Sequence, residues 1–280
     1  MAAANPRRFL LKLLFAAEGQ SLTTREMLAA GEVLGFSSNS LRVALVRLTS
    51  NGLIASPARG VYGLGPEAAA LAENARHWRS GEKRVRPWAG DWILVHTGGL
   101  ARTDRTALRR RDRVLDMLGL REYTRGLYLR PDNLAGGVIA VRARLRQLGL
   151  ETAASVLVAR DFEPAEQERV TKLWDGPALS RQYQRMRQEL ENWLQRADEL
   201  DIEDAAREVY RAGDQAIRTL IFDPLLPEPL VDTAARAAFT DTVLRFDDAG
   251  HRIWRALALE HTRNAPPVAS PRRHAPSRTH

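Results

Sequence analysis

The sequence predicts an α+β protein made of three folded segments, a linker and a short tail. Two patterns support this prediction. Apolar residues at helical spacing and one tight hairpin fill residues 1–65, and strands alternate with helices between residues 91 and 162. Amphipathic helices then dominate residues 163–263, so we expect a mostly helical C-terminal domain there.

The first segment predicts three helices followed by a β-hairpin. Helices are expected over Pro6–Ala17, over Thr23–Leu34, which opens with a capping box, and over Ser37–Ser50, where serine and asparagine oxygens can cap the start. Leu53–Leu64 is expected to form two strands around a tight turn at Pro57–Gly60. A short helix, a glycine-containing turn and a longer helix match a helix-turn-helix. Residues 1–65 therefore predict a winged helix-turn-helix DNA-binding domain.

The central segment predicts a compact mixed domain. Residues 66–90 are expected to form a linker helix and a basic hinge. Beyond them, three stretches favour strands and two favour helices; the middle strand stretch turns back on itself at Thr124-Arg125-Gly126. In chain order these stretches are Trp92–His96, Thr103–Leu118, Glu122–Leu129, Gly137–Leu148 and Ser155–Arg160. The resulting order, β-α-β-β-α-β, predicts a central ferredoxin-like domain over residues 91–162.

The C-terminal segment predicts amphipathic helices over Ser180–Arg196 and Ile202–Ile221. The proline-rich run Asp223–Pro229 is expected to break the helices and to open a final pair of them. Residues 264–280 contain Pro, Arg, Ser and His without periodicity, so a disordered tail is expected there.

Composition narrows the class of protein. The chain has 280 residues, a formal net charge of +8 and no cysteine, which excludes disulfides, thiol nucleophiles and cysteine-ligated metals. No apolar run is long enough to cross a bilayer, and we expect a cytoplasmic protein. Residues 1–150 hold 24 Lys and Arg against 12 Asp and Glu, whereas residues 151–263 hold 15 against 22. The excess of basic residues in the N-terminal half of the chain indicates a polyanionic partner.

The third predicted helix has two distinct faces. Leu41, Ala44, Leu45 and Leu48 recur at i, i+3, i+4 and i+7 and are expected to point inward. The opposite face suits a DNA major groove, because arginine can bridge guanine edges and asparagine can pair with adenine. The candidate DNA-binding residues, which include two from the hairpin, are Ser38, Asn39, Ser40, Arg42, Val43, Arg47, Arg59 and Tyr62.

Patterns typical of catalysis are missing, so we expect neither catalytic residues nor a cofactor or metal. The six histidines are scattered with no i, i+4 pair, and no phosphate-binding glycine-rich loop or nucleophile elbow occurs. One enzymatic alternative is a metal-dependent nuclease built on the central domain around Asp91. A further alternative is a winged-helix interaction module without operator specificity.

The whole chain resembles the PaaX family, the repressors of phenylacetic acid catabolic operons. The resemblance covers about residues 6–260 and depends on the order of several loose motifs. These motifs are Phe9–Phe15, Asn39–Leu48 with Asn51-Gly52-Leu53, Trp88–Val95, Leu118-Gly119-Leu120 with Gly126–Pro131, Trp174-Asp175 with Leu179 and Tyr183, and Asp223–Pro227. The run Asp223-Pro224-Leu225-Leu226-Pro227 is the most distinctive of them.

The resemblance implies a homodimeric transcriptional repressor that binds double-stranded operator DNA and is released by an aryl-CoA thioester such as phenylacetyl-CoA. Such an effector needs cations for its phosphates and apolar surfaces for its acyl group. Arginines on the Thr103–Leu118 helix and several aromatic rings have this chemistry, although a solvated helix face and packing anchors are the simpler interpretations of each. The candidate effector-binding residues are Arg105, Arg109, Trp92, Tyr128, Trp174 and Tyr183.

Overall fold

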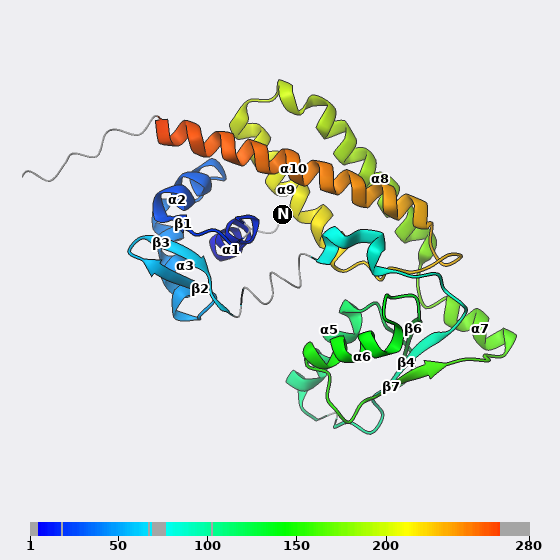
Figure 1. Ribbon diagram of the computed structural model, residues 1–280. Coiled ribbons are helices and arrows are strands. Elements are labelled where there is room, and N and C mark those ends of the chain that lie inside the picture. The colour runs from blue at the N-terminus through cyan, green and yellow to red at the C-terminus, as the bar shows by residue number, and fades with distance from the viewer. Residues whose placement is uncertain (1–4, 18, 67, 69–76, 102, 264–280) are drawn as a thin grey trace, which may run out of the picture.

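The computed structural model describes residues 5–17, 19–66, 68, 77–101 and 103–263. Helices and two antiparallel sheets build the fold, which confirms the predicted α+β class. Figure 1 shows three groups of elements: a small N-terminal group, a sheet covered by helices, and a layer of long helices that lies beside both.

The N-terminal group contains three helices and a three-stranded antiparallel sheet of order β1-β3-β2. Its elements are α1 (Pro6–Ala16), β1 (Leu22–Thr23), α2 (Thr24–Val33), α3 (Ser38–Ser50), β2 (Ile54–Ala58) and β3 (Val61–Leu64). The expected capping box is present: the Thr23 side chain accepts from the amide of Glu26, and the Glu26 carboxylate accepts from the amide of Thr23.

The hairpin differs from the predicted one in two respects. The strand β1 was not predicted, because two residues are too few to show a period; Leu22 and Thr23 pair with Tyr62 and Val61. The predicted turn Pro57–Gly60 is also too long. Pro57 lies inside β2, an edge strand, where the pairing register shifts between Ala55 and Ala58. A proline lacks the amide hydrogen that ladder pairing needs, so an irregular position on an edge strand accommodates it.

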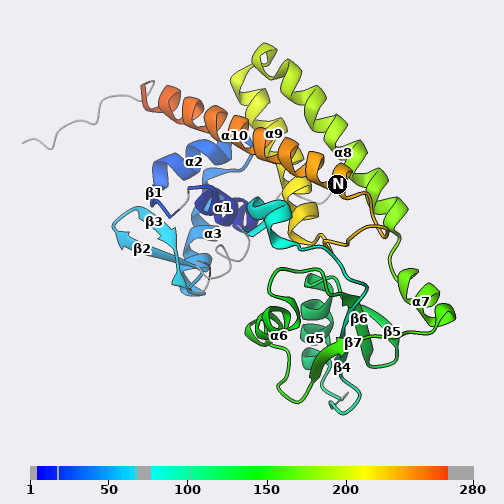
Figure 2. The same cartoon turned by 45° about the vertical axis from the view of Figure 1, so that its right-hand side comes forward.

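The central group forms a four-stranded antiparallel sheet of order β5-β6-β4-β7. Its elements in chain order are β4 (Trp92–His96), α5 (Arg105–Met117), β5 (Arg121–Thr124), β6 (Leu127–Pro131), α6 (Gly137–Gln147) and β7 (Ser155–Ala159). The strand β4 pairs along its whole length with β6 on one side and with β7 on the other. The helices α5 and α6 cover one face of this sheet (Figure 2).

Successive side chains of β4 point to opposite faces of the sheet and pack into two different cores. Ile93 and Val95 face the core beneath α5 and α6. Trp92 points to the opposite face and belongs to the core that is shared with the long helices. Its ring stacks on Trp174 with centroids 5.9 Å apart. The sheet domain is therefore joined to the helical layer by buried aromatic packing.

The helical layer contains four α-helices: α7 (Pro164–Thr171), α8 (Gly176–Arg196), α9 (Ile202–Ile221) and α10 (Thr233–Arg263). The predicted final pair of helices is wrong, because α10 runs unbroken for 31 residues. Gly250 does not interrupt it; a Cβ at this position would lie 2.7 Å from Val209 Cγ1 of α9, so glycine lets the two helices approach closely. No helix in the described ranges is long and apolar enough to span a membrane.

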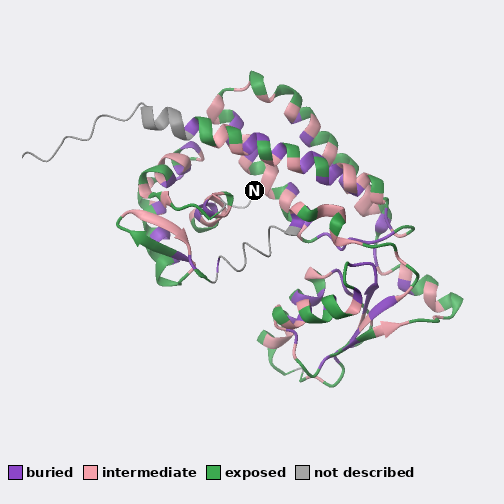
Figure 3. Cartoon of the chain, viewed as in Figure 1, coloured by how far each residue is buried: buried purple, intermediate pink, exposed green. Residues whose placement is uncertain are grey.

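The predicted linker is only partly described. Residues 67 and 69–76 lie outside the described residues, as does the predicted tail from residue 264. The end of the linker forms a 3₁₀ helix, η1 (His77–Arg84), and most of the expected linker helix falls on the residues that are not described. Trp78 of η1 is buried in the core of the helical layer. In Figure 3 the buried positions line the facing sides of the long helices, whose outer sides are exposed.

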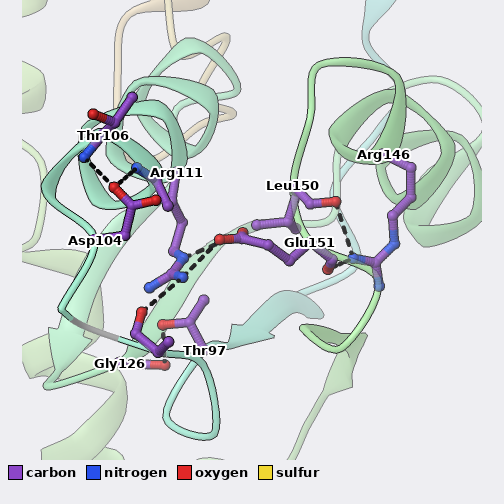
Figure 4. A network of polar contacts seen from close by, with 10 residues as sticks. Thr97, Asp104, Thr106, Arg111, Gly126, Arg146, Leu150 and Glu151 are labelled. Atoms are coloured by element: carbon purple, nitrogen blue, oxygen red, sulfur yellow. Dashed lines mark hydrogen bonds and ion pairs between the residues drawn. The ribbon is translucent and has the colours of Figure 1, made fainter.

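A buried ion pair stabilises the arginine-rich helix α5. Arg111 is only 4% exposed, and its guanidinium donates to both carboxylate oxygens of Glu151, at 2.7 and 3.3 Å (Figure 4). It also donates to the Ala101 carbonyl. The hydrogen bond from Arg111 lowers the pKa of Glu151 below its usual value of 4.5. Arg111 is thus a structural residue, unlike its exposed neighbours on the same helix.

We expect Glu151→Gln to lower the free energy of unfolding by about 1–3 kcal/mol at pH 7, because it leaves the buried Arg111 without a countercharge. A carboxylate with a lowered folded-state pKa stabilises the protein above its unfolded-state pKa, and this contribution is lost as the pH falls through the folded-state pKa. Urea denaturation of both proteins between pH 7 and pH 3 should therefore show the difference shrinking below about pH 4.5. A difference independent of pH would contradict the assignment.

Candidate nucleic-acid interface

The helix α3 presents one buried and one exposed face. Its start is capped by Ser37, whose hydroxyl oxygen accepts from the Ser40 amide at 3.2 Å. The four residues predicted to point inward are all buried: Leu41, Ala44, Leu45 and Leu48. They pack against Phe9 and Leu14 of α1 in the core of the N-terminal group. This packing fixes which residues of α3 face solvent.

The outward face of α3 carries the predicted candidates Asn39, Arg42, Val43 and Arg47, all of which are exposed. Val46 lies between them and is 66% exposed. An apolar side chain this exposed gains nothing from folding, and on a helix among arginines it suits contact with a thymine methyl group. The face has no acidic residue, since α3 contains none.

Two predicted serines have intramolecular partners. The Ser38 hydroxyl donates to the Glu32 carboxylate at 3.0 Å, and the Ser40 hydroxyl donates to the Ser37 carbonyl at 2.8 Å. Both residues are half-buried. Their side chains thus stabilise the turn before α3. The prediction that these two serines contact DNA phosphates now depends only on their position near the start of the helix.

The turn of the hairpin docks on the start of α2. The Thr24 amide donates to the Gly60 carbonyl at 2.7 Å, so the exposed residues Arg25 and Arg59 each adjoin this contact in the chain. Tyr62, predicted as a wing residue, is half-buried and packs against the N-terminal core. Arg25 was missed by the sequence prediction, although its place in the first turn of a capped helix next to the hairpin was a usable signal.

The charge of this domain is positive and largely uncompensated on the exposed face. Residues 5–65 hold seven Lys and Arg against three Asp and Glu. Within the described ranges, Arg42, Arg47 and Arg59 take part in none of the ion pairs, whereas Glu26 and Glu32 are occupied by Thr23 and Ser38. Cations without carboxylate partners are the groups that a polyanion can bind.

The N-terminal group is fastened to α9. Asp214 of α9 forms ion pairs with Arg8, at 2.9 Å, and with Lys12 of α1. Arg207 of α9 donates to the Val33 carbonyl at the end of α2, at 2.7 Å. The Phe9 and Tyr210 rings also meet edge to face. One helix of the helical layer therefore holds both α1 and α2.

The predicted effector residues do not form one site. Trp92 and Trp174 are buried and stacked, and each indole N–H already has a partner: Gln167 at 3.1 Å and the Gly119 carbonyl at 3.1 Å. The packing interpretation thus accounts for both rings. Tyr128 is half-buried and packs beside the core under α5 and α6.

Arg105 and Arg109 are exposed on α5. Tyr183 of α8 is fully buried and stacks on Phe239 with centroids 5.9 Å apart. Its edge lines a surface hollow between α8 and α9 that neither arginine reaches. Of the six candidates, Tyr183 alone lines the wall of this hollow.

The nuclease alternative depended on Asp91. Its carboxylate, which precedes β4, forms an ion pair with Arg160 at 2.8 Å, and its carbonyl accepts from the Trp88 indole. Among the described residues, no group of three or more Asp, Glu and His lies together in a way that could hold a metal ion. Asp91 therefore has a structural partner in the protein.

Comparison with known proteins identifies the last part of the chain. Residues 174–256 match the family model of the PaaX-like protein C-terminal domain. The resemblance to the PaaX family predicted from the sequence is thereby confirmed, and the matched range spans α8, α9 and most of α10.

The fold also resembles a solved structure, that of the uncharacterized protein Rv0674 from Mycobacterium tuberculosis. The TM-score is 0.60 at 23% sequence identity, and the alignment covers 92% of this chain and 98% of the other. At this identity the likeness shows the fold alone. No curated protein sequence matches the chain.

The two faces of α3 can be tested with adjacent residues. Leu45→Ala is expected to lower the free energy of unfolding by about 2–5 kcal/mol, because it opens a cavity in the N-terminal core. Val46→Ala serves as the matched control and should change it by less than about 0.5 kcal/mol. Urea denaturation followed by far-ultraviolet circular dichroism measures both. Similar losses in the two variants would contradict the assigned orientation of α3.

Proposed function

We propose that the protein is a transcriptional repressor of the PaaX type that binds operator DNA through α3. The observation that carries this proposal is the exposed face of α3, which combines arginines, an asparagine and apolar side chains and contains no acid. A PaaX-like C-terminal domain supports a transcription regulator of the PaaX type. The proposal includes the cytoplasm, at the nucleoid, as the place where the protein acts.

In this proposal residues 1–65 are a winged helix-turn-helix. The helices α2 and α3 form the helix-turn-helix, and β2 and β3 form the wing. Arg42 and Arg47 of α3 would contact guanine edges in the major groove, and Asn39 near its start would pair with adenine. Arg25 and Arg59 would hold phosphates on either side of the α2 start, where helix amides also attract anions.

The remaining parts take supporting roles in the proposal. The sheet order β5-β6-β4-β7 supports a ferredoxin-like arrangement for residues 91–162. The protein would bind two half-sites as a homodimer, so operator symmetry should match protein symmetry. An aryl-CoA thioester, such as phenylacetyl-CoA, would release it from DNA by favouring an arrangement that cannot bind both half-sites.

We expect Arg42→Ala and Arg47→Ala each to weaken operator binding by about 1–3 kcal/mol, because each removes a base contact. Arg185→Ala is the matched control, since this exposed arginine belongs to α8, a helix that Figure 1 shows apart from the N-terminal group. Mobility shifts on DNA from upstream of the protein's own operon give the affinities, and size-exclusion chromatography checks the oligomer. Unchanged affinity in both α3 variants would exclude α3 as the reading helix.

Arg25→Ala and Arg59→Ala are expected to weaken binding to operator and scrambled DNA equally, because phosphates carry no sequence information. Each substitution should reduce the slope of log affinity against log salt concentration by about 1. Titrations between 50 and 200 mM salt measure the slope. A loss confined to the operator would instead assign these arginines to base reading.

A further inference from the structure

The helix α5 exposes a row of arginines on the face that turns away from the sheet. Arg105, Arg109 and Arg113 follow one another at intervals of four residues, and all three are exposed. Residues four apart lie on the same face of an α-helix, about 6 Å from each other along its axis. We call these three residues the α5 ridge. Val114 and Leu115 on the opposite face are buried in the core of the sheet domain, so the ridge points to solvent.

The α5 ridge has no countercharge within the part of the chain that the structure describes. None of its three guanidinium groups takes part there in an ion pair or donates a hydrogen bond, whereas the buried Arg111 of the same helix pairs with Glu151. Of the two acids of α5, Asp116 pairs with Arg121, and Asp112 forms no ion pair with the ridge. The fold thus gives a partner to the structural arginine of α5 and none to the ridge.

The neighbouring helix α6 adds to the positive charge. Together α5 and α6 contain eight arginines and two aspartates. Arg142 of α6 donates to the Val156 carbonyl at 2.7 Å, and Arg146 donates to the Ala154 carbonyl at 2.5 Å. Because a carbonyl is neutral, these bonds hold the side chains in place and leave their charges uncompensated. The helix-covered side of the sheet is therefore a positively charged surface.

A row of like charges lowers the stability of the helix that carries it. Like charges four residues apart on a helix repel each other, and Arg109 has an arginine at this spacing on both sides. The exposed guanidinium groups gain no burial and no ion pair that would offset the repulsion. The stability of the fold does not account for the α5 ridge, whereas a bound polyanion would neutralise it.

The α5 ridge and the proposed DNA-binding domain lie toward the same flank of the molecule. In both views the helices α5 and α6 lie on the side of the sheet that is nearer to the N-terminal group (Figures 1 and 2). The N-terminal group is fastened to α9 through Asp214 and Arg207, and the sheet domain is joined to the helical layer through Trp92 and Trp174. A long, stiff polyanion can therefore contact both parts of one chain.

A second copy of this chain is the other charged partner to consider, because residues 151–263 hold more acids than bases. The acids of the long helices, however, are largely paired within the chain. Those with an arginine partner include Glu189, Glu191, Glu203, Glu208 and Asp214. Double-stranded DNA carries about one negative charge per 1.7 Å of its length, and none of these charges has an internal partner. Charge complementarity therefore favours DNA.

We propose that the α5 ridge binds the phosphate backbone of double-stranded DNA outside the half-site that α3 reads. The planar guanidinium group of arginine matches the geometry of phosphate oxygens, and such contacts add affinity without sequence information. Arg105 and Arg109, predicted from the sequence to bind an effector, bind DNA phosphates in this proposal. The proposal deepens the proposed function and rests on it, since it enlarges the same protein–DNA contact.

The test measures binding of the full chain to a long duplex of scrambled sequence by fluorescence anisotropy, between 50 and 200 mM salt. The double variant Arg109→Gln/Arg113→Gln removes two charges of the α5 ridge and keeps a residue of similar helix propensity. The slope of log affinity against log salt concentration should fall by about 2, since each phosphate contact contributes about 0.9. Arg181→Gln/Arg185→Gln removes two exposed arginines at the same spacing on α8 and should leave the slope unchanged.

Two further measurements check the folded state. Without DNA, the Tm of Arg109→Gln/Arg113→Gln should be equal to or higher than that of the wild type, because the change relieves repulsion along α5. A fall of several degrees would show that the ridge stabilises the fold, and would overturn the proposal. A smaller oligomer in size-exclusion chromatography would assign the ridge to a second copy and would also overturn it, as would equal slopes for the two double variants.

The ratio of operator affinity to scrambled affinity separates this proposal from the proposed function. Arg109→Gln/Arg113→Gln should keep the wild-type ratio, because phosphate contacts contribute equally to both sequences. If the wild type prefers the operator and the slope of the variant is unchanged, the repressor stands and the α5 ridge fails. If the slope falls by about 2 and no sequence is preferred, the ridge stands as a DNA-binding surface and the proposed function fails.

Discussion

The fold depends on a set of buried hydrogen bonds at the segment between α9 and α10. The carbonyl oxygens of Pro224, Leu225 and Leu226 accept, respectively, from Arg130 of β6 at 3.4 Å, from Asn133 at 2.6 Å and from Arg236 of α10 at 2.6 Å. Arg130 and Arg236 are each only 1% exposed, and burial lowers the pKa of Arg130 to about 9, so it stays charged at neutral pH. These carbonyls hold the sheet domain to the helical layer. Losing them would remove one hydrogen bond from each of two buried guanidinium groups, at a cost of about 1–3 kcal/mol for each.

The same segment packs closely against the sheet domain. Gly119 has a φ of +70°, and a Cβ on it would lie 2.8 Å from Pro224. The lack of a side chain therefore lets the backbone at Gly119 pack directly against Pro224. The junction is thus tightly packed on one side. On the other side, Asp223 and Tyr183 line a surface hollow.

Local signals predicted most of the elements, because their causes lie within a few residues. The Thr23 capping box, the inward stripe of Leu41 to Leu48 and the strand Trp92–His96 each depend on spacing along the chain. The strand β1 and the irregular position of Pro57 depend on pairing across the sheet, which spacing does not reveal. The same limit applies to the candidate sites. Trp92 and Trp174 have the chemistry of ligand-binding rings, but only the three-dimensional structure shows that the two rings stack on each other. Asp223 and Tyr183, which line one hollow, lie 40 residues apart in the sequence and carry no joint sequence signal.

The central claim is that an exposed face of α3 reads operator DNA and that a thioester controls the binding. The most direct measurement is a mobility shift of the full-length protein on DNA from upstream of its own operon, against a scrambled sequence of the same composition. Phenylacetyl-CoA, free CoA and phenylacetate are added in parallel. The account predicts binding at least a thousandfold tighter to one upstream segment than to scrambled DNA, as for specific regulators in general, and release by the thioester alone. Equal affinity for the upstream and scrambled DNA would contradict it.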